Sequence, residues 1–235
     1  MKKLVLILIF ALFLASLFSI RVTKSFFSDT EKATSNILSV ATEFSSTPTP
    51  SPTPIPTPTP SPTPLINHVV INEVFYFVDD DHKIGNSESG SEWVELYNPT
   101  AGPVPLTNWS IEDNTTCDNF PGSPSLQTGG FAILSTHTEA EFRAVWTSIP
   151  SGVVFIQSPT AIGNGLANND ELILRDVPCG GGSIVDHISW GSNISGLNPS
   201  ISMTARGHSS ERDPDGKDTN TATDFVDRSP PTPGN

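Results

Sequence analysis

The chain lacks the sequence motifs that mark several large enzyme classes. Its 235 residues contain no GxSxG, HExxH or Walker A sequence, which argues against a serine hydrolase of that type, a zinc protease and a P-loop protein. The five histidines are scattered, and none lies at ligand spacing from a second histidine. The two cysteines, Cys117 and Cys179, have no matching histidine pair and so do not make a zinc site. We therefore expect no cofactor.

Basic residues are also few. The chain has 12 Lys and Arg against 25 Asp and Glu, and its net charge is −13. From residue 65 onward there are 22 acidic and 7 basic residues, so this part carries about −15. Because an acidic domain repels phosphate groups, nucleic acid is not expected as a partner. The charge can also serve solubility alone.

The first 25 residues are predicted to be a signal peptide or an N-terminal membrane anchor. Two lysines precede an apolar run over residues 4–20, which Arg21 ends. This order is typical of a secretory signal, although 17 residues are slightly long for a signal and slightly short for a membrane span. Cleavage after Ser25 and an uncleaved anchor therefore both stay open. Either outcome predicts that the rest of the chain is extracellular or lies at the cell surface.

A short polar segment, residues 26–46, is followed by a Thr/Ser-Pro linker, residues 47–64. Every second residue of the linker is proline. Because proline fixes φ and lacks an amide donor, the linker should adopt an extended polyproline II shape. Eighteen residues at about 3.1 Å each would span roughly 55 Å. We interpret the linker as a spacer whose hydroxyl groups are candidate O-glycosylation sites.

The remaining residues, 65–235, are numerous enough for one domain with a hydrophobic core. Most segments have the alternation of a short strand, with Gly, Pro and Asn between them, which predicts an all-β sandwich or barrel. The residues between the last two of these strands, 178–182, should form a hairpin turn. The expected strands cover residues 69–78, 92–97, 104–112, 131–134, 153–156, 171–177 and 183–190.

One short helix is expected among these strands. Thr138 and Glu141 have the spacing of a capping box. The apolar residues that follow would share one face of the helix, and they are Phe142, Val145, Trp146 and Ile149. The four tryptophans are expected to fill or flank the core, and they are Trp93, Trp109, Trp146 and Trp190.

An exported domain could contain a disulfide between Cys117 and Cys179. The bridge would close a loop of about 60 residues and, in the chain-entropy model, add roughly 4 kcal/mol of stability. The alternative is two unpaired thiols in separate loops.

Two groups of acidic residues are candidates for chemistry. Glu73 and Glu95 can be interpreted as a general acid/base pair, or as buried structural carboxylates with Arg212 as a partner for either. Three further carboxylates, Asp213, Asp215 and Asp218, surround a glycine turn as in calcium loops. The glycine is fourth rather than sixth in that run, so the spacing does not fit an EF-hand, and the alternative is a loop before the last strand.

Seven segments of the chain, taken in order, resemble the lamin tail domain family. They are VVINEVFY (69–76), EWVELYNPT (92–100), VPLTNWSIED (104–113), GGFAILS (129–135), LANNDELILRD (166–176), IVDHISWG (184–191) and SSERDPDGKDTNTATDF (209–225). The resemblance implies an immunoglobulin-like β-sandwich with one short helix over residues 65–235. An acidic insertion, residues 79–90, departs from the family pattern and lengthens a loop.

The resemblance also implies a set of scaffold residues. They are Asn72, Glu73, Trp93, Glu95, Asn98, Trp109, Asp170, Arg212, Asp224 and Phe225.

A second resemblance covers residues 23–42, which are similar to the leaders of camelysin-type and biofilm-matrix precursors. It rests on an FSDTE run followed by an asparagine, residues 27–31 and Asn36. The alanine that usually precedes the aromatic residue is absent, and Ser25 stands near its place. This resemblance implies export by a dedicated signal peptidase in a bacterium with a Gram-positive-like surface.

Together these features predict a non-enzymatic module displayed at the cell surface. The resemblance implies that it binds a protein or a cell-surface polymer in adhesion or scaffolding, with membrane contact through the N-terminal segment if that segment is not cleaved. One alternative is an accessory module of a separate exported hydrolase, because bacterial relatives are often joined to nuclease or protease domains. Another is a calcium- or polysaccharide-binding module.

Overall fold

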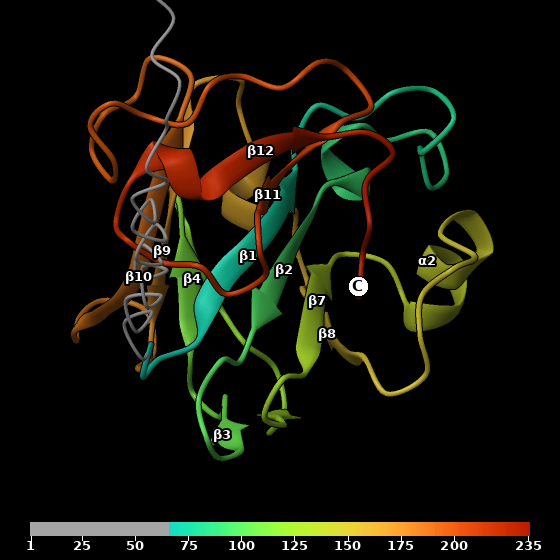
Figure 1. Ribbon diagram of the computed structural model, residues 1–235. Helices are drawn as coiled ribbons and strands as arrows, with labels where there is room; N and C mark the ends of the chain where they lie inside the picture. The colour runs from blue at the N-terminus through green and yellow to red at the C-terminus, as the bar shows by residue number, and fades with distance from the viewer. Residues whose placement is uncertain (1–65) are drawn as a thin grey trace, which may run out of the picture. The chain divides into compact units, whose positions relative to one another are not determined.

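The computed structural model describes residues 66–235 (Figure 1). The predicted signal or anchor, the polar segment, the Thr/Ser-Pro linker and the leader resemblance lie outside the described residues. Among residues 66–235, no helix has the length and apolar character that crossing a membrane would need.

The strands of the described part form two larger sheets and one small one. The six-stranded sheet has the order β12 (Phe225–Arg228), β11 (Ser209–Arg212), β1 (Val70–Phe75), β2 (Trp93–Tyr97), β7 (Phe131–Ser135) and β8 (Val154–Gln157). The four-stranded sheet has the order β10 (Ile184–Trp190), β9 (Asp170–Arg175), β4 (Ser110–Glu112) and β5 (Cys117–Asn119). The small sheet pairs β3 (Val104–Pro105) with β6 (Ser125–Leu126).

The main core lies between the six-stranded and four-stranded sheets. Ile71 and Val74 of β1, which lie on either side of a register shift in the pairing with β2, are fully buried there with Leu172 and Leu174 of β9. Tyr76 stacks on Trp190, with ring centroids 4.9 Å apart. Each buried aliphatic side chain contributes about 1.5–3 kcal/mol relative to an exposed one. This two-layer packing agrees with the immunoglobulin-like β-sandwich predicted from the sequence.

A second core covers the outer face of the six-stranded sheet. The chain runs from β7 through α2 (Glu139–Val145) to β8, and β7 and β8 are parallel (Figure 1). This connection brings Phe142 and Trp146 against Trp93, with ring centroids 6.1 and 5.6 Å apart. Ile84 of the acidic insertion is part of the same cluster. The insertion therefore covers part of the sheet as well as lengthening a loop.

The predicted helix has the expected start but ends early. Thr138 and Glu141 form the capping box. The helix ends at Val145, so Trp146 and Ile149 reach the second core from the segment that follows.

Several strand predictions need correction. The strand predicted at 104–112 is broken into β3 and β4 by a turn in which Asn108 has φ 63°. Two short strands, β5 and β6, and the polar strand β11 were not predicted, and β12 was expected only as a last strand after the loop at 213–218, without bounds. The hairpin of β9 and β10 is confirmed. Three 3₁₀ turns complete the described elements: η1 (Ser89–Ser91), η2 (Ile162–Asn164) and η3 (Ala222–Asp224).

Candidate functional site

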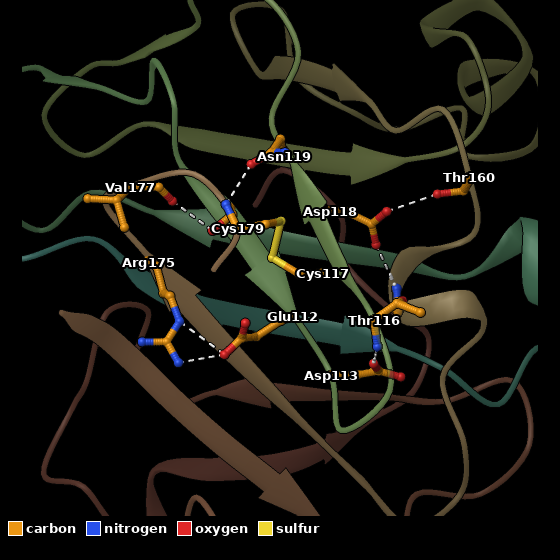
Figure 2. Close-up of a disulfide and its surroundings, with 12 residues drawn as sticks. Glu112, Asp113, Thr116, Cys117, Asp118, Asn119, Thr160, Arg175, Val177 and Cys179 are labelled. Carbon is orange, nitrogen blue, oxygen red and sulfur yellow. Dashed lines mark hydrogen bonds and ion pairs between the residues drawn. A yellow bond between two sulfur atoms is a disulfide. The ribbon is translucent and has the colours of Figure 1, made fainter. Parts of the chain in front are cut away.

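The predicted disulfide between Cys117 and Cys179 is confirmed (Figure 2). Cys117 begins β5, at the edge of the four-stranded sheet, and Cys179 lies in the turn between β9 and β10. Their Cα atoms are 5.8 Å apart, and 62 positions separate them in the sequence. The bridge thus joins the edge strand to the hairpin at the other side of β4.

Polar contacts surround this bridge. The side chain of Asn119 accepts a hydrogen bond from the amide of Cys179 at 2.8 Å (Figure 2). Asp118 accepts hydrogen bonds from the hydroxyl of Thr160 and the amide of Gly163, each at 2.9 Å. These bonds connect β5 to the loop around η2, so the bridged edge holds a long connection in place.

Glu73 and Glu95 are cross-strand neighbours on β1 and β2, and Glu211 of β11 lies opposite Glu73 on its other side. Glu73 and Glu95 are 0 % exposed. The backbone of the C-terminal segment covers them, because Thr232 N donates to Glu73 at 3.1 Å and Gly234 N donates to Glu95 at 2.5 Å. This row of carboxylates therefore fastens the end of the chain to the sheet and is closed to a substrate.

Burial changes the protonation of this row. It raises the pKa of Glu73 to about 8, although hydrogen bonds from Ser209 and Thr232 act in the opposite direction. Burial also raises the pKa of Glu95 well above its usual value, and the neighbouring Glu73 raises it further. Perturbed carboxyl pKa values are common in active sites, but here a fully buried scaffold produces them without an opening to solvent.

The expectation that Arg212 would pair with Glu73 or Glu95 is wrong. Arg212 is 2 % exposed, and its Nη2 lies 3.0 Å from Asp186 of β10. Asp186 also accepts a hydrogen bond from Ile71 N at 2.7 Å. The pair therefore connects the six-stranded sheet to the four-stranded sheet through the protein interior. Sequence reasoning missed Asp186, for which the only signal was an acidic residue in a strand between two apolar residues at positions i−2 and i+2, Ile184 and Ile188.

Two more predicted scaffold residues surround Arg212. Its guanidinium lies over the ring of Phe225, 4.5 Å from the ring centroid. Asp224, which is fully buried, lies 3.7 Å from Nη1 of Arg212 and accepts a hydrogen bond from Thr219 N at 2.7 Å. This arrangement places a buried cation between acidic and aromatic groups.

The calcium hypothesis for residues 213–218 is not supported by the geometry, because the three carboxylates have separate partners. Asp218 pairs with His68 at 3.0 Å and with Arg212 at 3.3 Å, and the hydrogen bond from His68 helps to lower its pKa to about 2. Asp215 accepts a hydrogen bond from Asn72 at 3.0 Å, and Asp213 lies 3.8 Å from Arg228. Among the described residues, no group of three or more acidic, histidine or cysteine side chains could hold a metal ion.

The remaining predicted scaffold residues organise turns and cores. Asn98 donates to the carbonyls of Gly102 and Leu126, at 2.9 Å each. Asp170 accepts a hydrogen bond from Ala167 N at 2.8 Å. Trp109 belongs to the core between the sheets, and Trp93 belongs to the second core.

A cavity that the sequence did not indicate lies beside η1 and the loop after η2. Its volume is about 510 Å³, and Glu92, the residue before β2, is part of its lining. Burial raises the pKa of Glu92 to about 8. In the sequence this glutamate is one polar position of an alternating strand, so nothing distinguished it from a solvent-facing residue.

The comparisons with known proteins agree with this fold. A family model described as the Lamin Tail Domain matches residues 62–192, which is more than half of the chain. The chain therefore belongs to the lamin tail domain family. This family is a non-catalytic module, and no enzyme family was found on the chain. A comparison with curated proteins found no match.

The family match ends before the last two strands of the described fold. Residues of β11 and β12 follow position 192, yet β11 pairs with β1 and with β12 in the six-stranded sheet. The last quarter of the described part, residues 193–235, is therefore integral to the sandwich.

Proposed function

We propose that the chain is an exported, non-enzymatic module at the cell surface that binds a protein or a surface polymer in adhesion or scaffolding. The observation that carries the proposal is the structural role of the buried charged side chains. Glu73, Glu95 and Arg212, the side chains most suited to chemistry, are buried and hold backbone segments and other side chains in place. A domain of this kind offers a rigid outer surface to a partner.

Two further features support a location outside the cytoplasm. Disulfides such as Cys117–Cys179 persist mainly in oxidising compartments. The N-terminal apolar run and the Thr/Ser-Pro linker have the composition of an export segment and a spacer, which would hold the domain away from a membrane. An acidic surface with few basic residues also favours partners that are not nucleic acids.

The experiment uses the full chain, with an epitope tag inserted into the polar segment at residues 26–46. Intact cells that express the chain are treated with an external protease, and the tag should be lost while a cytoplasmic marker stays intact. The chain is then purified and mixed with cell-surface extract, and bound polymers and proteins are identified. We expect saturable binding of one partner and no turnover of polysaccharide, peptide or nucleic acid substrates.

Two results would contradict the proposal. The first is protection of the tag in intact cells, which would place the chain inside. The second is hydrolysis of a substrate by the purified chain that Glu73→Gln abolishes, which would make the buried row catalytic. Copurification with an exported hydrolase would instead favour the accessory role.

A further inference from the structure

The cavity beside η1 is formed where two irregular segments meet. Glu88 and Ser89 contribute from the η1 side, and the loop after η2 contributes from the other. Gly165, which has φ 103°, lies so close to η1 that an added Cβ would be 3.0 Å from Cβ of Ser89. The remaining lining residues are Tyr76, Phe77, Glu92, Asn164, Leu166, Ala167 and Asn168.

Glu92 lines this cavity, which is open to solvent, and one of its carboxylate oxygens has no hydrogen-bond donor among the described residues. The residue is only 4 % exposed. Its Oε2 accepts a hydrogen bond from Leu166 N at 2.8 Å. No described residue donates a hydrogen bond to Oε1, and this atom is not among the fully enclosed polar atoms of residues 66–235 that lack a partner. Oε1 is therefore not fully enclosed and is free to accept a hydrogen bond from a ligand.

The charge of the lining selects the sign of a ligand. Among residues 66–235, no Lys, Arg or His lines the cavity, whereas Glu88 adds a second carboxylate. The negative charge of Asp170, at the start of β9, also raises the pKa of Glu92. A cationic group would be attracted, and an anionic group would be repelled. A metal ion is disfavoured, because no group of three suitable ligands exists among the described residues. Calcium and magnesium ions take about six or more oxygen ligands.

The hydrogen-bonding capacity of Glu92 distinguishes two organic cations. A guanidinium binds a carboxylate best with two parallel hydrogen bonds, which need both oxygens. Since Leu166 N already occupies Oε2, one oxygen is left for a ligand. An ammonium group needs one such acceptor and can place its other donors on the amide oxygens of Asn164 or Asn168.

From these contacts we infer that the cavity binds the primary ammonium group of a lysine side chain on a partner protein. The narrow, flexible stem of lysine can reach a carboxylate that is almost fully buried, while its methylene groups pack against Phe77. An amine attached directly to a sugar ring would have to bring the whole ring to a carboxylate that is only 4 % exposed. The inference rests on the proposed role as a binding module and gives that role a specific site.

The protonation of Glu92 adds a signature to this interaction. Burial, together with Glu88 and Asp170, raises its pKa to about 8, so the free side chain holds a proton at neutral pH. An ammonium ligand stabilises the ionised carboxylate, so binding should release a proton. The affinity for lysine should therefore rise as the pH increases from 6 to 8.

The test measures the binding of acetyl-Gly-Gly-Lys-Gly-Gly-amide to the full chain in detergent micelles by calorimetry. Glu92→Gln keeps the size of the side chain and an oxygen for Leu166 N, and it should weaken binding at least tenfold. The matched control is Asp176→Asn, which removes the same charge from an exposed position and should change the affinity less than twofold. A norleucine peptide, which has a similar stem and no charge, should not bind.

In the unmodified chain, titration with the lysine peptide should shift the amide NMR signal of Leu166 and leave that of Cys179 unchanged. This measurement keeps the inference testable if Glu92→Gln does not fold. Equal losses in Glu92→Gln and Asp176→Asn would overturn the site in favour of general acidic attraction. Two further probes test the choice of lysine, namely the same peptide with arginine in place of lysine and a glucosamine hexamer. Tighter binding of either probe would overturn that choice. If the Glu92→Gln variant captures the surface partner as well as the unmodified chain does, the site is refuted and the proposed function stands.

Discussion

Removal of the disulfide should cost the domain about 4 kcal/mol of stability in the chain-entropy model. The change is the double variant Cys117→Ser with Cys179→Ser. The loop between the two cysteines spans 62 positions, and the bridge restricts this length of chain in the unfolded state. Both residues are only partly buried, so the smaller serine side chains should add little loss of packing. Most of the effect should therefore come from the unfolded state.

The assay is urea unfolding of the full chain, followed by tryptophan fluorescence. The double variant should unfold at lower urea, and the unmodified chain under reducing conditions should match it. The slope of the free energy against urea should increase without the bridge, because the unfolded chain then exposes more surface. The native fluorescence should be unchanged, since the four tryptophans lie in the two cores.

A control variant separates the effect of the disulfide on stability from the effect of the hydrogen bonds around it. Asn119→Ala removes the acceptor for the amide of Cys179 but keeps the covalent loop, and it should cost only about 1 kcal/mol. A loss below about 1 kcal/mol for the double variant would refute the entropic reasoning. Two reactive thiols in the unmodified, unreduced chain would refute the bridge itself.

Three further predictions concern buried groups. The pKa of Glu73 rises from 4.5 to about 8 on folding, so its contribution to stability is present below pH 4.5 and is lost as the pH rises to about 8. Glu73→Gln should flatten this part of the pH profile of the unfolding free energy, by a few kcal/mol at most. Arg212→Met should cost roughly 3–5 kcal/mol in urea unfolding, because buried carboxylates lose their cation. Gly163→Ala should lower the melting temperature more than Gly122→Ala, because both have positive φ but only at Gly163 would the Cβ lie 2.5 Å from Cγ of Asp113.

Local sequence patterns predicted the elements that alternate. Three predicted strands place pairs of side chains two positions apart in the core between the sheets: Val94 and Leu96 of β2, Ala132 and Leu134 of β7, and Ile188 and Trp190 of β10. The sequence of β2 alternates accordingly, whereas β7 has four consecutive apolar residues. The start of α2 was predictable because the capping box is a contact between residues three positions apart. Its early end was not, because Trp146 packs against Trp93, which is far away in the sequence.

The polar strand β11 could not be predicted from its own residues. Its sequence, SSER, has no apolar position, yet all four residues are buried. Ser209, Glu211 and Arg212 have partners elsewhere in the chain, namely Glu73, Arg228 and Asp186. The hydroxyl of Ser210 is the exception, because it is buried without a hydrogen-bond partner among the described residues. Partners offset the cost of burying charged groups, and they are brought together by the sheet pairing rather than by the local sequence.

The sequence alone determined the family, the β-rich class, the helix cap and, with two cysteines in the chain, the partners of the disulfide. These are properties of residue order, short-range spacing and composition. The tertiary structure alone decided that Arg212 pairs with Asp186, that Glu73 and Glu95 hold the C-terminal segment, and that Glu92 lines an open cavity. The physical reason is that burial and charge pairing depend on residues up to 159 positions apart, whose proximity arises only when the two sheets are assembled.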